Sequence, residues 1–150
     1  MCVVINEFDD YLEVTAGKAL KPTHIQTKPY PGFPTDMHPQ FSALLCKADG
    51  ESTVTENIFS NRFKYVDELA KMGAEIVVDD RVARIHGGRE LCGAEVVSVD
   101  LRAGAALIVA GLAANGRTTV TNIDLIKRGY EDIVEKFRSI GADIFEISED

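Results

Sequence analysis

The sequence has 150 residues, 45% of them hydrophobic and 27% charged, a composition typical of a single globular domain. Its 16 Lys and Arg and 24 Asp and Glu residues give a net charge of −8. This charge argues against binding to long nucleic acids, where neutralisation of phosphates supplies most of the affinity. No apolar run approaches the roughly 18 residues of a membrane span. The three cysteines lack the spacing of a disulfide framework or a metal site, so we expect reduced thiols, no metal and a cytoplasmic location.

Hydrophobic periodicity and turn residues predict strands and helices that alternate along the chain. In order, we expect strands near 2–6, 11–15 and 22–27, a helix over 37–48, a strand over 52–55, a helix over 62–72, strands near 75–79, 82–86 and 94–98, a helix over 102–114, a strand over 118–121, a helix over 129–140 and a strand over 143–147. The chain opens directly on two short strands, which predicts that it is a piece of a longer protein.

Two of the predicted helices have similar boundaries. Asp36 fits the N-cap of the first, Pro39 falls in its first turn and Gly50 lies just past its end. Asp100 and Gly116 occupy the corresponding places around a second helix, which is apolar nearly all round and should be deeply buried.

The order strand, helix, strand, helix, strand occurs twice, and four features recur at nearly constant spacing. These are Asp36 with Asp100 (64 positions), "GESTVT" at 50–55 with "GRTTVT" at 116–121 (66), Arg62 with Arg128 (66) and "MGAEI" at 72–76 with "IGADI" at 140–144 (68). We therefore expect a single partial domain with a repeat tail at 1–33, a full repeat at 34–99 and a partial repeat at 100–150.

Each repeat has an Asp at the start of its first helix and an Arg at the start of its second. Arg102, two residues after Asp100, adds a cation to the same region. Helix N-termini favour bound anions, so Asp36, Arg62, Asp100, Arg102 and Arg128 are candidate site residues. The alternatives are that each Asp only caps a helix and that each Arg is a solvated surface charge.

The remaining reactive side chains form no recognisable site. His24, His38 and His86 are scattered without ligand spacing, and we expect His38 to be a surface residue of the first helical turn, although it could line the same site. Cys46 falls on the helix that follows Asp36, where we expect buried packing. No nucleophile pair or phosphate-binding loop of the usual forms is found.

Four segments, "YPGFPTDM", "TENIFSNRF", "VDLRAGAALIVAG" and "IKRGYEDI", together resemble the enolpyruvyl transferases of cell-wall synthesis. They occur in order along nearly the whole chain, which would cover about the last third of such an enzyme. The resemblance implies an α/β fold of two lobes, each made of three βαβαββ units around a pseudo-threefold axis, an inside-out α/β barrel. This chain would be an incomplete lobe.

The resemblance also implies a reaction. The family moves the enolpyruvyl group of phosphoenolpyruvate onto the 3-hydroxyl of UDP-N-acetylglucosamine, the first committed step of peptidoglycan synthesis, and no cofactor is expected. The family's proton-donating cysteine and its lysine–asparagine pair belong to motifs that this sequence lacks. We therefore expect the missing N-terminal lobe to be the partner of this chain, and the chain alone to be inactive.

By motif, the resemblance assigns roles to six residues: Asp36 as the base for the sugar hydroxyl, Ile58 at the uridine nucleotide, Arg62 and Arg128 around phosphoenolpyruvate, and Asp100 with Arg102 as an acid–arginine pair at the reaction centre. A carboxylate suits deprotonation, and planar guanidinium groups suit phosphate and carboxylate. Asp100 could raise the pKa of Asp36 or steady an arginine, and the sequence leaves both open.

Other interpretations remain beside this one. A lobe like that of enolpyruvylshikimate phosphate synthase shares the architecture and phosphoenolpyruvate, although "TENIFSNRF" and "PGFPTDM" favour the amino-sugar enzyme. A ligand-binding or purely structural module is a second alternative. An enzyme that modifies RNA ends is disfavoured by the net charge of −8.

Overall fold

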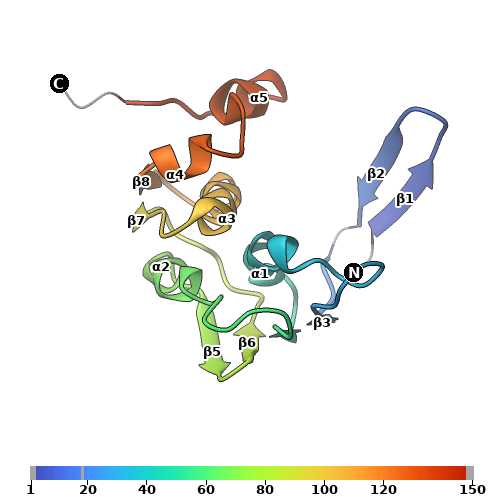
Figure 1. Ribbon diagram of the computed structural model, residues 1–150. Coiled ribbons are helices and arrows are strands. Elements are labelled where there is room, and N and C mark those ends of the chain that lie inside the picture. The colour runs from blue at the N-terminus through green and yellow to red at the C-terminus, as the bar shows by residue number, and fades with distance from the viewer. Residues whose placement is uncertain (1–2, 18, 148–150) are drawn as a thin grey trace.

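The computed structural model describes residues 3–17 and 19–147, whose strands and helices alternate as expected of an α/β protein (Figure 1). The strands are β1 (Val3–Glu7), β2 (Leu12–Ala16), β3 (His24–Gln26), β4 (Glu51–Thr55), β5 (Glu75–Asp79), β6 (Val82–His86), β7 (Glu95–Val97) and β8 (Thr119–Thr121). The helices are the 3-10 helix η1 (Thr35–Met37), α1 (His38–Leu45), α2 (Tyr65–Lys71), α3 (Leu101–Leu112), α4 (Asp124–Lys127) and α5 (Ile133–Ser139).

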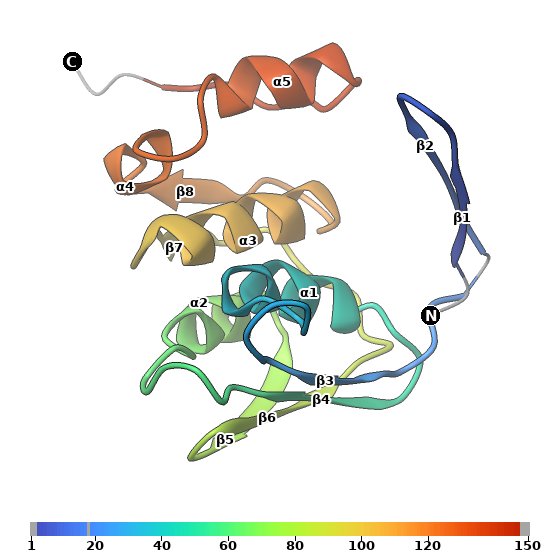
Figure 2. The ribbon, with the colours of Figure 1, turned by 45° about the vertical axis from the view of Figure 1, so that its right-hand side comes forward.

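The described strands form three small sheets. β1 and β2 make an antiparallel hairpin that stands apart from the rest of the chain (Figure 2). The largest sheet has the order β3-β4-β6-β5, with β3 and β4 parallel and the other pairs antiparallel. β7 and β8 form a parallel pair. A helix connects the strands of each parallel pair, α1 between β3 and β4 and α3 between β7 and β8, as a parallel connection requires. These matching units fit the expected repeat, which stays a prediction.

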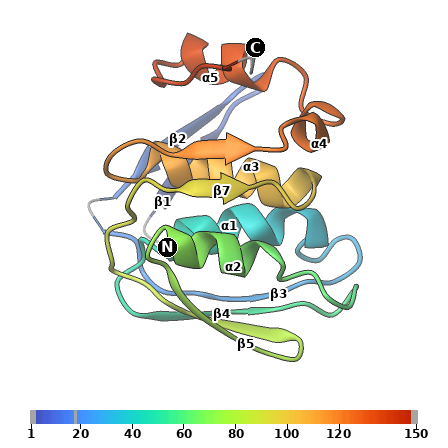
Figure 3. The ribbon, with the colours of Figure 1, turned by 90° about the vertical axis from the view of Figure 1, so that its left-hand side faces the viewer.

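The helices α1, α2 and α3 lie inside and the sheets outside, whereas α5 has no buried residue. Figure 1 shows α1 and α3 between three sheets, and Figure 3 shows β7 and β8 on one side of the helices and the four-stranded sheet on the other. The core includes Leu45, Tyr65, Leu69, Ile85 and Leu107, all at most 1% exposed. Burial of such side chains is the main stabilising contribution to the fold. The described residues form no closed barrel, and this layout agrees with the inside-out α/β lobe expected from the sequence.

The deep burial predicted for the helix over 102–114, which is α3 in the structure, is confirmed. Every residue of α3 from Ala103 to Ile108 is buried. Gly104 allows this burial, because a Cβ at this position would overlap the side chains of Ile126 on α4 and Ser98 after β7. The close approach of α4 to α3 therefore depends on the missing side chain of one glycine.

Most predicted elements are confirmed to within a few residues, although Cys2, in the strand expected over 2–6, lies outside the described residues. Gly73 and Gly141 both have positive φ angles, of 89° and 95°, as expected of glycines that end helices. In the described part of the chain, no helix has the length and apolar character needed to cross a membrane.

Three expectations about the elements are corrected. The helix predicted over 37–48 is instead η1 followed by α1, and it ends at Leu45. The helix predicted over 129–140 begins only at Ile133, as α5, because Asp132 before it adopts a left-handed φ of 47°. The short helix α4 over Asp124–Lys127 was not predicted.

The strand predicted over 143–147 does not form. Its counterpart β5 is held by an antiparallel ladder with β6. Among the described residues, no ladder pairs the segment over 143–147 with another strand. A strand without a partner leaves its backbone groups unpaired and is not stable by itself.

Candidate functional site

Asp36 lies between two arginines from different elements. Its Oδ1 accepts a hydrogen bond from Nη1 of Arg62 at 3.2 Å, and its Oδ2 accepts one from Nη2 of Arg102 at 2.7 Å. Asp36 is in η1, Arg62 precedes α2 and Arg102 is in the first turn of α3. The side chain of Asp36 is 49% exposed and those of the arginines 20% and 35%, so the cluster is open to solvent. The structure thus brings together three of the residues expected at the site.

The two arginines change the acidity of Asp36. The hydrogen bond from Arg102 is the main reason that the pKa of Asp36 lies below its ordinary value, and Arg62 adds to this effect. Asp36 in turn raises the pKa of Arg102, and the charge of Asp100 adds to that shift. Of the two roles left open for Asp100, these shifts favour the steadying of an arginine over a raised pKa of Asp36.

Asp36 is not the helix cap that its position predicted. The N-caps of η1 and α1 are Pro34 and Met37, and neither has a side-chain cap hydrogen bond. The reason is the extra 3-10 turn before α1, which carries Asp36 inside a helical segment and leaves its carboxylate free to face the arginines.

Asp100 does cap its helix. Its backbone is extended, and its Oδ1 accepts hydrogen bonds from the amides of Arg102 at 2.9 Å and Ala103 at 2.8 Å. These bonds satisfy two of the amides that have no partner within the helix. They also fix the start of α3, from which the side chain of Arg102 reaches Asp36.

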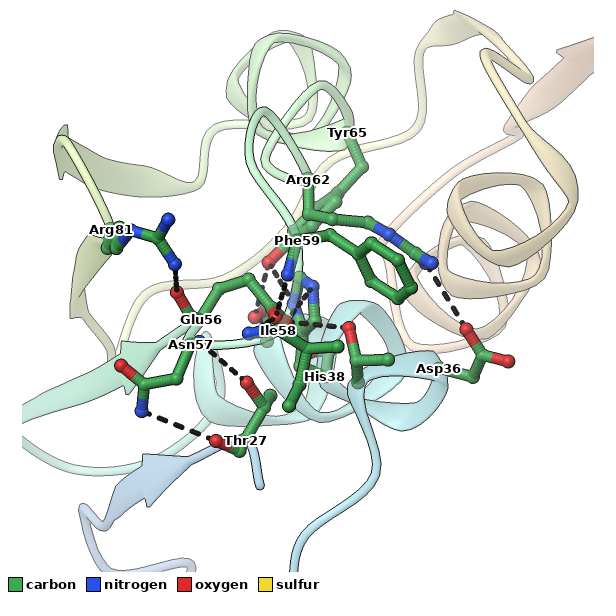
Figure 4. Close-up of polar contacts among 12 residues, drawn as sticks. Thr27, Asp36, His38, Glu56, Asn57, Ile58, Phe59, Arg62, Tyr65 and Arg81 are labelled. Carbon is green, nitrogen blue, oxygen red and sulfur yellow. Dashed lines mark hydrogen bonds and ion pairs between the residues drawn. The ribbon is translucent and has the colours of Figure 1, made fainter. Parts of the chain in front are cut away.

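A turn after β4 carries the second half of the cluster. The guanidinium group of Arg62 lies 4.6 Å from the ring centroid of Phe59, a cation–π contact that limits the arginine's freedom. Ile58, expected at the uridine nucleotide, is half-buried in the same turn. Ile58 thus lies four residues before Arg62 on the same short segment, and Figure 4 shows both side chains together with that of Phe59.

Glu56, at the start of this turn, is not among the candidate site residues expected from the sequence. It is 1% exposed, and its carboxylate accepts hydrogen bonds from the amides of Ile58 and Phe59 and from the hydroxyl of Thr35. Burial raises the pKa of Glu56, but these hydrogen bonds outweigh burial and keep the pKa below its ordinary value. The available signal was an acid directly after a half-buried strand, a position where a charge that turns inward needs partners.

His38 is fully buried, which corrects the expected surface position. It packs against the rings of Phe63 and Tyr65, because His38 lies on the face of the first turn of α1 that is directed towards the start of α2. Its Nδ1 lies 3.2 Å from the Tyr65 hydroxyl, and its Nε2 lies 3.3 Å from Glu56 without a well-aligned hydrogen bond. Burial lowers the pKa of His38 to about 4, although the charge of Glu56 opposes this shift. The imidazole is therefore neutral at neutral pH.

Arg128 is exposed and lies at the C-cap of α4, not at the start of a helix. The segment that carries it is tied to the site by its neighbours. Tyr130 accepts a hydrogen bond from Gln40 of α1 at 3.1 Å, and Gly129 packs so close to Leu101 of α3 that a Cβ would lie 2.8 Å from it. Arg128 therefore comes from a segment anchored on both helices whose ends hold the Asp36 cluster.

A metal centre is not expected from the sequence, and within residues 3–17 and 19–147 no group of three or more His, Cys, Asp or Glu side chains could hold a metal ion. The chemistry available at this cluster is that of one carboxylate and several guanidinium groups, a set suited to anions and to proton transfer.

Residues 1–137 match the protein family described as EPSP synthase (3-phosphoshikimate 1-carboxyvinyltransferase). The chain is 50% identical over 149 residues to UDP-N-acetylglucosamine 1-carboxyvinyltransferase 3 of Caldanaerobacter subterraneus subsp. tengcongensis, which is 99% of this chain and 36% of that protein. It is 54% identical over 142 residues to the UDP-N-acetylglucosamine 1-carboxyvinyltransferase of Finegoldia magna, which is 95% of this chain and 34% of that protein.

Among solved structures, the enolpyruvyl transferase NikO from Streptomyces tendae matches with a TM-score of 0.87 and 32% identity, over 95% of this chain and 33% of that one. The chain spans about a third of the length of these three relatives. With the family match over 137 residues, these similarities show that the chain belongs to the EPSP synthase family of enolpyruvyl transferases.

Proposed function

We propose that this chain forms part of a UDP-N-acetylglucosamine 1-carboxyvinyltransferase, which transfers enolpyruvyl from phosphoenolpyruvate to the 3-hydroxyl of UDP-N-acetylglucosamine in the first committed step of peptidoglycan synthesis. The observation that carries the proposal is the contact of Asp36 with both Arg62 and Arg102. The names of the relatives at 50% and 54% identity support a nucleotide sugar as acceptor over shikimate 3-phosphate. The free thiols of Cys46 and Cys92 fit a reducing cytoplasm.

In this proposal the arginines bind the anionic substrate. Phosphoenolpyruvate carries a phosphate and a carboxylate, and the planar forks of Arg62, Arg102 and Arg128 can bind both groups bidentately. The same charges stabilise the phosphate-bearing tetrahedral intermediate, a type of contribution that is often the largest in catalysis. Asp100 acts through Arg102 by capping α3, which holds the start of the helix that carries this guanidinium group.

Asp36 takes the proton of the sugar 3-hydroxyl as that oxygen attacks. In the free chain its pKa is lowered by the arginines, and a carboxylate in that state is a weak base. The anionic groups of phosphoenolpyruvate compete with Asp36 for the same guanidinium groups. Binding of this substrate therefore releases the carboxylate and raises its pKa, so the base becomes effective once its reaction partner is present.

The 150 residues supply only one part of this site. Ile58 would contact the uridine nucleotide from this side, and the rest of the enzyme, including the family's proton-donating cysteine, would come from the N-terminal lobe. We therefore expect this chain by itself to release no phosphate from phosphoenolpyruvate.

The activity test uses a chimera in which this chain replaces the matching third of the Finegoldia magna relative, to which it is 54% identical. We expect phosphate release that requires both substrates and that Asp36→Asn lowers by at least about 100-fold, the contribution of a positioned base. Asp79→Asn, which removes the same charge from exposed strand β5, is the matched control. Full activity of the Asp36→Asn chimera would show that Asp36 is not the base.

The choice of acceptor is tested in the same chimera and by calorimetry on the chain alone. Phosphate release with shikimate 3-phosphate in place of the nucleotide sugar would support the enolpyruvylshikimate phosphate synthase alternative. A chimera that folds but is inactive with either acceptor, together with a chain that binds neither, would leave this lobe as a structural module.

A further inference from the structure

Glu56 connects two turns that are distant in sequence. Its Oε1 accepts hydrogen bonds from the amides of Ile58 at 2.7 Å and Phe59 at 3.0 Å, while its Oε2 accepts one from the hydroxyl of Thr35 at 2.7 Å (Figure 4). A buried carboxylate that accepts three hydrogen bonds is held in a single orientation. The turn after β4 and the turn before α1 are therefore fixed to each other through one side chain.

Both turns carry residues of the candidate site. Thr35 is followed directly by Asp36, and Phe59 supports the guanidinium group of Arg62 through the cation–π contact. The hydrogen bond between Asp36 and Arg62 thus joins the same two turns on their solvent side. A shift of either turn would change the distance between this acid and this arginine.

The second repeat has a simpler version of this connection. Asn122, 66 positions after Glu56, also follows the second strand of a parallel pair, and its amide donates a hydrogen bond to the carbonyl oxygen of Ser98 at 2.9 Å, just before α3. A neutral side chain is therefore sufficient to tie these segments together. A buried charge costs free energy that a neutral side chain does not, so the acid in the first repeat needs a further reason.

We propose that Glu56 is a positioning residue of the transferase site, which sets the geometry of Asp36 against Arg62 and the orientation of the turn that carries Ile58. Its consequence for catalysis rests on the proposed function, whereas its effect on the geometry does not. His38 packs against the Glu56 carboxylate on its buried side, with its Nε2 3.3 Å from Oε2 of Glu56.

The test measures the pKa of the Asp36 carboxylate by carbon-detected NMR in the 150-residue chain, wild type and Glu56→Gln. Loss of positioning loosens the contacts of Asp36 with Arg62 and Arg102, so its pKa should rise, by about one unit. Removal of a nearby negative charge without movement has the opposite sign and lowers the pKa of Asp36. A pKa that is unchanged or lower in Glu56→Gln would overturn the proposal.

Three further variants complete this test, two that change the same connection and one that serves as a control. Thr35→Val removes one hydrogen bond without touching the charge and should also raise the pKa of Asp36, even if Glu56→Gln does not fold. Glu56→Ala should have a larger effect than Glu56→Gln, whose amide oxygen can still accept from the amides of Ile58 and Phe59. Glu51→Gln, which removes an exposed charge from the same strand β4, should leave the pKa of Asp36 unchanged.

The Finegoldia magna chimera then measures the catalytic consequence. We expect Glu56→Gln to lower kcat by at least about tenfold, the scale of effect of a misplaced catalytic group, and Glu51→Gln to have no effect. An active chimera with an unchanged kcat in Glu56→Gln would overturn the catalytic part of the proposal. An inactive wild-type chimera would instead count against the proposed function, while the NMR measurement would still decide whether Glu56 positions Asp36.

Discussion

Nη2 of Arg102 lies 2.7 Å from Oδ2 of Asp36, although the two residues are 66 positions apart in the sequence. One belongs to η1 before α1 and the other to the first turn of α3, so the contact joins the two expected repeats. It forms because α1 and α3 pack against each other inside the sheets. The candidate site is therefore a property of the packed helices.

Substitution of Arg102 by Gln should raise the pKa of Asp36 more than the same substitution of Arg62. The hydrogen bond from Arg102 is the largest influence on that carboxylate, and it is shorter, at 2.7 Å against 3.2 Å. The measurement is an NMR titration of the Asp36 carboxylate in each variant. Arg89→Gln, which removes an arginine paired with Glu75, serves as control and should leave the titration unchanged. Equal titration curves for wild type and Arg102→Gln would contradict the prediction.

Addition of inorganic phosphate should also raise the pKa of Asp36 in the wild-type chain. The phosphate competes for the guanidinium groups of Arg62 and Arg102 and so removes the contacts that favour the ionised carboxylate. The same NMR titration, with and without excess phosphate, measures this effect. Phosphate should change the titration much less in Arg102→Gln. A wild-type pKa that does not respond to phosphate would mean that anions do not compete with Asp36.

The stability of the chain should fall as the pH is lowered from about 6.5, because of His38. Its pKa is about 4 in the folded chain against 6.5 in the unfolded chain, so the unfolded chain binds a proton that the folded chain does not. The contribution is complete above pH 6.5 and is lost towards pH 4, at up to about 1.4 kcal/mol per pH unit. Glu56 adds a loss in the same direction below its ordinary value of 4.5.

Urea unfolding followed by circular dichroism, between neutral pH and about pH 5, measures the slope due to His38 before Glu56 titrates. His38→Gln replaces the imidazole with a side chain that does not titrate and should flatten this slope. His24→Gln, at an exposed histidine of β3, should leave the slope as in the wild type. If the stability of His38→Gln falls with pH as steeply as that of the wild type, the pH dependence is due to other groups.

Gly104→Ala should destabilise the chain by about 1–3 kcal/mol, the usual cost of an additional methyl group in a packed core. The new Cβ would overlap Ile126 and Ser98, and it would push α4 away from α3. Urea unfolding of Gly104→Ala measures the loss. Gly111→Ala, in the same helix, is the matched control, because its Cβ would meet Thr118 at 3.1 Å and needs only a small adjustment. Equal stabilities of the two variants would contradict the close-packing argument.

The sequence predicted the local features of the fold because their causes are local. Strand alternation, helical periodicity and helix-ending glycines depend on neighbouring residues, and these elements are confirmed apart from the corrections at α1, α4 and α5 and at residues 143–147. The cap at Asp100 was predicted for the same reason, since it bonds only to Arg102 and Ala103. The cap predicted at Asp36 was wrong, because Asp36 lies within a 3-10 turn that precedes α1. Whether such a turn forms depends on what the segment packs against.

The sequence by itself determined an α/β chain of this family, with Asp36, Arg62 and Arg102 among its candidate site residues. Only the tertiary structure decided that these three side chains meet, that His38 is buried and that Glu56 connects the two turns of the site. Each of these facts depends on partners 18 to 66 residues away. Burial and ion pairing are set by the packing of distant elements, and no periodicity within one element records them.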